Sequence, residues 1–105
     1  MSALKERAAQ FVHAKLGVPP RQLLANRRQR ELVRARALFV WCARNTSPVP
    51  SYPAIGRMLD RHHSSIMNSA DTARTLIAID PVFARMCDEW RALERTRKET
   101  SHAPA

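Results

Sequence analysis

Residues 37–43 form an uninterrupted apolar run, the longest in the chain, and they complete a helical pattern that starts near residue 31. A helix that is apolar on every side must be covered by several neighbouring elements. The residues Phe39-Val40-Trp41 would also suit a β-strand, but no nearby segment has a pattern that could pair with them. We therefore predict a central helix over residues 31–44, with the other elements packed around it.

Apolar spacing and boundary residues indicate the other helices. Ser2 can cap a first helix, which Gly17 would end in a left-handed conformation. Ser51 can cap a short helix, and Asp80-Pro81 combines a cap with a first helical position. The expected inner stripe of the last helix consists of Phe83, Met86 or Cys87, Trp90 and Leu93. The predicted helices cover residues 2–16, 20–25, 31–44, 53–59, 63–79 and 81–97.

These segments predict an all-α fold, a compact domain of five or six helices that contains a helix-turn-helix. A chain of 105 residues that is 45% hydrophobic has enough apolar side chains for one core. We expect the domain to cover residues 1–97 and the last residues, 98–105, to form a disordered tail.

Positive charge is concentrated in one part of the chain. The formal net charge is +9, and residues 21–44 contribute +6 of it, since they hold seven arginines and one glutamate. Clustered arginines favour a polyanionic partner, because guanidinium groups bind phosphates by charge and by forked hydrogen bonds. A solvated basic face without a partner is the alternative that charge alone leaves open.

Several classes of function lack the residues they need. Cys42 and Cys87 are too far apart in sequence for a zinc knuckle, and adjacent His62 and His63 point about 100° apart on a helix. No catalytic constellation, Gly-rich phosphate loop or membrane-length apolar segment is present. We therefore expect no enzyme activity, no cofactor, no metal, no small-molecule substrate and no membrane contact. The expected location is the cytoplasm, in association with the nucleoid.

The segment around Asp60 has the pattern of a helix-turn-helix. A short helix over residues 53–59 precedes a polar break of three residues and a longer helix over residues 63–79. An apolar stripe on the longer helix is expected to face the core. Its outward face would then carry the short polar side chains Ser64, Ser65, Asn68, Ser69 and Thr72, which can enter a major groove and contact bases or phosphates. An ordinary helical hairpin with a polar surface has the same pattern.

Residues 55–66, which read Ile-Gly-Arg-Met-Leu-Asp-Arg-His-His-Ser-Ser-Ile, resemble the signature of the C-terminal DNA-binding domain of the bacterial replication initiator DnaA. That signature ends in Gly-Gly-Arg-Asp-His-Thr-Thr-Val, which Arg61, His63, Ser64-Ser65 and Ile66 match. Upstream, residues 27–36 resemble the basic loop of the family, and the resemblance extends over about residues 4–95.

The resemblance implies a role for individual residues. Arg28 aligns with an arginine that enters the minor groove, and His62, His63 and Ser64 align with positions that read the major groove. Arg36, Ser65, Tyr52 and Pro53 would hold phosphates. The full candidate set for binding DNA is Arg27, Arg28, Arg30, Arg34, Arg36, Tyr52, Pro53, Arg61, His62, His63, Ser64, Ser65 and Asn68.

Three positions differ from the family pattern. Asp60 replaces the Gly-Gly pair, His62 replaces a base-reading aspartate, and Asp71-Thr72 replaces a basic pair further along the helix. Binding to duplex DNA is expected to survive these changes, whereas they bear directly on which sequence is preferred.

We expect this chain to be a stand-alone domain that binds double-stranded DNA with some sequence preference, as a small regulator of transcription or replication initiation. A helical protein-interaction adaptor and a non-specific nucleic-acid-binding module are the alternatives. The sequence does not predict whether the protein is a monomer or a dimer.

Overall fold

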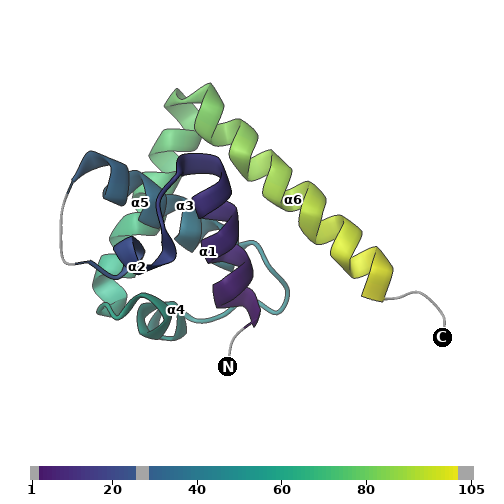
Figure 1. Cartoon of the computed structure of the whole chain (residues 1–105), viewed down its shortest axis with the longest axis horizontal. Helices are drawn as coiled ribbons and strands as arrows, with labels where there is room; N and C mark the ends of the chain where they lie inside the picture. The colour runs from purple at the N-terminus through teal and green to yellow at the C-terminus, as the bar shows by residue number, and fades with distance from the viewer. Residues whose placement is uncertain (1–2, 26–28, 102–105) are drawn as a thin grey trace.

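A computed structural model describes residues 3–25 and 29–101. Within these residues the fold consists of six helices and contains no strand (Figure 1). This confirms the predicted all-α class. The helices are α1 (Ala3–Leu16), α2 (Pro20–Leu23), α3 (Arg30–Arg44), α4 (Tyr52–Leu59), α5 (His63–Ile79) and α6 (Pro81–Ser101).

The central helix is α3, as the apolar run predicted. Every residue from 35 to 43 is buried, and α3 packs against α1, α2, α5 and α6. Because neighbours cover it on all sides, each apolar side chain of residues 37–43 enters the core and is removed from water.

The helix ends follow the capping residues in the sequence. Gly17 has a φ of +71° and its N–H donates to the carbonyl of His13 (2.9 Å), while Ser51 Oγ accepts from the N–H of Ala54 (3.2 Å). Asp80 Oδ1 accepts from the N–H of Val82 (3.0 Å) and of Phe83 (3.3 Å), and thereby caps α6. The predicted cap at Ser2 lies outside the described residues.

The predicted inner face of α6 is wrong at one position. Phe83, Cys87 and Trp90 are buried as expected, but Leu93 is 56% exposed, and Glu94 is buried in its place. The buried face continues at Glu94 because this residue lies one helical turn beyond Trp90. The carboxylate of Glu94 is paired with Arg7 (3.2 Å) and Arg97 (3.1 Å), which offsets the cost of burying it.

The helix α6 also continues to Ser101, four residues into the stretch that was predicted to be disordered. Its second half extends beyond the rest of the molecule (Figure 1). Residues 102–105 lie outside the described part of the chain.

Candidate nucleic-acid interface

The turn between α4 and α5 gives the helix-turn-helix its shape. Asp60 takes the left-handed conformation (φ 53°, ψ 50°), and the N–H of Arg61 donates to the carbonyl of Gly56 (2.8 Å). Aspartate tolerates this conformation better than most residues other than glycine. A single Asp60 thus serves as the left-handed residue of a turn for which the family signature has two glycines.

Gly56 is needed because the chain folds back onto it. A Cβ atom at this position would lie 2.4 Å from the backbone carbonyl oxygen of Arg61, which is closer than two non-bonded atoms can approach. Gly56 is part of the segment that resembles the family signature, but the resemblance implied no role for it. Its role depends on the backbone of residues 61 and 62 passing directly over α4.

The first turn of α5 presents polar side chains to solvent. His62, His63, Ser64 and Ser65 are exposed, as is Asn68 one turn further on, while Ile66 is fully buried beneath them. The predicted outer face is therefore confirmed for Ser64, Ser65 and Asn68, whereas Ser69 and Thr72 are half-buried.

His62 caps α5 with its side chain. Its Nδ1 accepts from the backbone N–H of Ser64 (3.2 Å) and lies 2.8 Å from Ser64 Oγ. The rings of His62 and His63 stack at a centroid distance of 4.2 Å. These local contacts hold both rings at the helix N-terminus, where N–H groups and the helix dipole favour phosphate oxygens.

Residues of α4, of the turn and of the start of α5 line an open hollow. Its volume is about 440 Å³. It is lined by Pro53, Gly56, Arg57, Asp60, Arg61, His62 and His63. Arg57 is exposed at this hollow and was absent from the predicted set, although it lies inside the segment that resembles the family signature.

A second hollow, with a volume of about 610 Å³, lies between α1 and α6. That second hollow is lined in part by Phe11, Trp90 and Leu93. It contains none of the predicted DNA-binding residues.

Tyr52 and Pro53 begin α4, where they were predicted to contact phosphates. Pro53 is exposed, whereas Tyr52 is half-buried under the guanidinium of Arg44, whose carbon lies 4.3 Å from the ring centroid. Arg44 also donates to the carbonyl of Pro50 (2.9 Å). These contacts fix the start of α4 against the end of α3.

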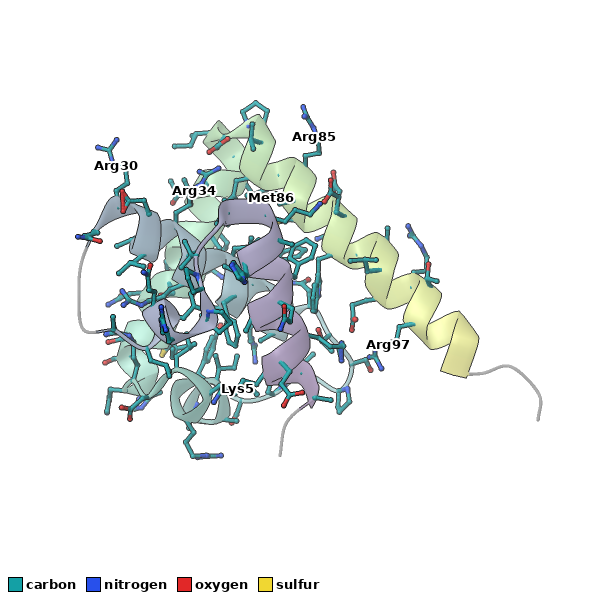
Figure 2. The ribbon with its side chains drawn as sticks, in the orientation of Figure 1. Lys5, Arg30, Arg34, Arg85, Met86 and Arg97 are labelled. Carbon is teal, nitrogen blue, oxygen red and sulfur yellow. The ribbon has the colours of Figure 1, made fainter. Side chains whose placement is uncertain are left out.

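The predicted basic residues differ in their surroundings. Arg27 and Arg28 lie outside the described residues. Arg30 is exposed at the start of α3 and points away from the other helices, whereas Arg34 lies among them (Figure 2). Arg34 forms an ion pair with Asp80, and its guanidinium carbon lies 5.5 Å from the centroid of the Phe83 ring. Arg34 therefore joins α3 to the start of α6, and the DNA contact predicted for it stays a prediction.

Arg36 and Arg61 are also engaged within the protein. Arg36 is only 6% exposed, and its Nε donates to the carbonyl of Leu23 (3.1 Å) while its Nη2 donates to that of Ala25. Arg61, which is half-buried, donates from Nη2 to the same carbonyl of Ala25. The burial of Arg36 and these two hydrogen bonds give it a structural role, and the phosphate contact predicted for it stays a prediction.

Further features of the described part of the chain concern its potential metal ligands, its helices and its thiols. No group of three His, Cys, Asp or Glu residues there could hold a metal ion, and no helix there is long and apolar enough to cross a membrane. Burial raises the pKa of the Cys42 thiol well above its ordinary value and that of Cys87 to about 12. Both thiols therefore stay protonated, in the unreactive form.

A family model described as the bacterial DnaA protein helix-turn-helix matches residues 6–72, which include α4 and the first part of α5. The chain belongs to this family. Members of the DnaA helix-turn-helix family bind double-stranded DNA, and the membership indicates DNA binding for this chain. Comparison with curated proteins found no match, and comparison with solved structures found none either.

Proposed function

We propose that this protein binds duplex DNA with a sequence preference, and that the first turns of α5 read bases in the major groove. The observation that supports this most directly is the exposed polar surface formed by His63, Ser64 and Asn68 above the buried Ile66. Short polar side chains let a helix approach the base edges closely, and their donors and acceptors distinguish one base pair from another.

Affinity would come from cations around this surface. Arg57 is exposed on α4 beside the first turn of α5, and Arg30 is exposed at the start of α3. We propose that these arginines contact phosphates together with Arg27, and that Arg28 enters the minor groove, as the DnaA resemblance implies. Phosphate contacts position a protein on DNA, whereas base contacts give the preference.

The role that fits such a domain is a small regulator of transcription or of replication initiation, acting in the cytoplasm on the nucleoid. A module that binds nucleic acid without preference is the competing function. Selection of bound duplexes from a random library separates the two, because only a base-reading protein enriches a common sequence.

The double variant His63→Ala with Ser64→Ala tests the reading surface. Both side chains are exposed, so we expect the fold to persist while the ratio of affinities for selected and scrambled duplexes falls about tenfold or more. Thr75→Ala is the matched control, since Thr75 is exposed on the second half of the same helix. Fluorescence anisotropy with both duplexes measures the ratio. An unchanged ratio in the double variant would contradict the assignment of α5 as the reading helix.

A further inference from the structure

Two arginines that are distant in sequence converge on one carbonyl oxygen. Arg36 comes from the middle of α3 and Arg61 from the turn between α4 and α5, and both donate to the carbonyl of Ala25. Arg36 also donates to the carbonyl of Leu23. The short segment after α2 is thus hydrogen-bonded both to the central helix and to the helix-turn-helix.

This arrangement brings two positive charges close together. Burial lowers the pKa of Arg36, and the charge of Arg61 lowers it further. A carbonyl oxygen has two lone pairs and can accept from both guanidinium groups. The hydrogen bonds to Ala25 therefore act against the repulsion between the two side chains, and removal of Arg61 leaves Arg36 as the remaining side-chain donor of the two.

The position of Ala25 in the chain gives this contact a consequence for binding. Ala25 directly precedes residues 26–30, which contain three of the arginines in the proposed DNA contacts. On its other side, Arg61 directly precedes His62, the residue that caps α5. One hydrogen bond therefore connects the chain that leads into the basic segment with the chain that leads into the reading helix.

We propose that Arg61 is a positioning residue that sets where the basic segment begins relative to α5. The proposal rests on the function proposed above. Arg61 would act through Ala25 and would not itself hold a phosphate, since its Nη2 faces a protein carbonyl and its Nε is buried. Loss of this contact would weaken simultaneous binding of the two elements to one DNA site.

Arg61→Lys separates positioning from direct phosphate binding, because lysine retains the positive charge but its ammonium nitrogen is one bond nearer to the backbone than the Nη2 that donates to Ala25. We expect R61K to lower the affinity for a selected duplex about tenfold and to leave the affinity for a scrambled duplex within about twofold. The dependence of binding on salt should stay unchanged, since the number of cations is the same. The matched control is Arg85→Lys, at an exposed arginine of α6 that is not among the proposed DNA contacts.

Hydrogen exchange without DNA tests the contact itself. The N–H groups of Leu24 and Ala25 donate to the carbonyls of Arg21 (3.2 Å) and Gln22 (3.1 Å). We expect R61K to accelerate exchange at these two amides and to leave amides in the middle of α3 as protected as before. A cooperative thermal transition confirms that the variant is folded.

The outcomes distinguish this proposal from the one on which it depends. If the unaltered protein binds no duplex, the proposed function fails and the role of Arg61 fails with it. If the unaltered protein prefers its selected duplex and R61K keeps that preference, only the role of Arg61 is overturned. Unchanged exchange at Leu24 and Ala25 also overturns that role.

Discussion

The two ends of α5 differ in how they are held. At the N-terminal end, His62 and Ser64 bond mainly to each other, and the surface around them is polar and exposed. At the C-terminal end, Asp80 accepts from two N–H groups of α6 and pairs with Arg34 of α3. One end of the helix is therefore fastened to its neighbours, and the other presents side chains to a partner.

This difference shows that arginines in one segment have separate tasks. Arg30 is exposed, Arg34 joins two helices, and Arg36 is buried against backbone carbonyls. The +6 charge of residues 21–44 is consequently not all available to DNA. Part of it stabilises the fold that presents the reading helix.

The largest effect on stability is expected at the turn between α4 and α5, before the N-terminal end of α5. Gly56→Ala would place a methyl group against the carbonyl of Arg61, where the backbone must move to make room. We expect a loss of about 3 kcal/mol in the free energy of unfolding. Gly17→Ala is the comparison, because Gly17 has open space around it and only a left-handed φ, which costs about 1 kcal/mol. Urea denaturation measures both, and equal losses would contradict the close approach at Gly56.

The stability contributed by Asp80, at the C-terminal end of α5, should depend on pH. The hydrogen bond from Arg34, together with backbone N–H groups, lowers the pKa of Asp80 below its ordinary value. In the unfolded chain an aspartate has a pKa of about 3.9. Ionised Asp80 therefore contributes its full stability above that pH, and the contribution is lost as the pH falls through the lower pKa of Asp80 in the folded protein. We expect Asp80→Asn to melt at a lower temperature than the unaltered protein at neutral pH.

The difference in melting temperature should shrink as the pH falls below about 4, because the native Asp80 then becomes protonated as well. Asp88→Asn, at an exposed aspartate of α6, serves as the control. A deficit for D80N that stays constant from neutral to acid pH would show that the ion pair with Arg34 contributes no stability.

The smallest effect is expected for single arginine variants, which distinguish the exposed Arg30 from Arg34, the partner of Asp80. Arg30→Ala should weaken binding to every duplex by a few fold and reduce the slope of log affinity against log salt by about 1, as expected for one phosphate contact. Arg34→Ala should lower the melting temperature and leave that slope unchanged. Anisotropy titrations at several salt concentrations measure the slopes. Identical changes in both variants would remove the distinction between them.

Much of the fold was predictable from local patterns. The all-round apolar run placed the central helix, Gly17 and Asp80-Pro81 marked helix ends, and the outward face of α5 followed from its apolar stripe. These features depend on residues within one or two helical turns, which is why a sequence displays them. The expected burial of Leu93 was wrong because the side of α6 that faces the core depends on how the helix crosses its neighbours.

The sequence alone determined the helices, their order and the membership of a DNA-binding family. The tertiary structure decided which arginines hold the protein together and which remain exposed. An arginine binds whichever carbonyl or carboxylate comes within reach, and Asp80 and Ala25 lie far along the chain from Arg34 and Arg61. Such partners are brought together only by packing, so composition and spacing predict the charge of the segment without predicting the use of each residue.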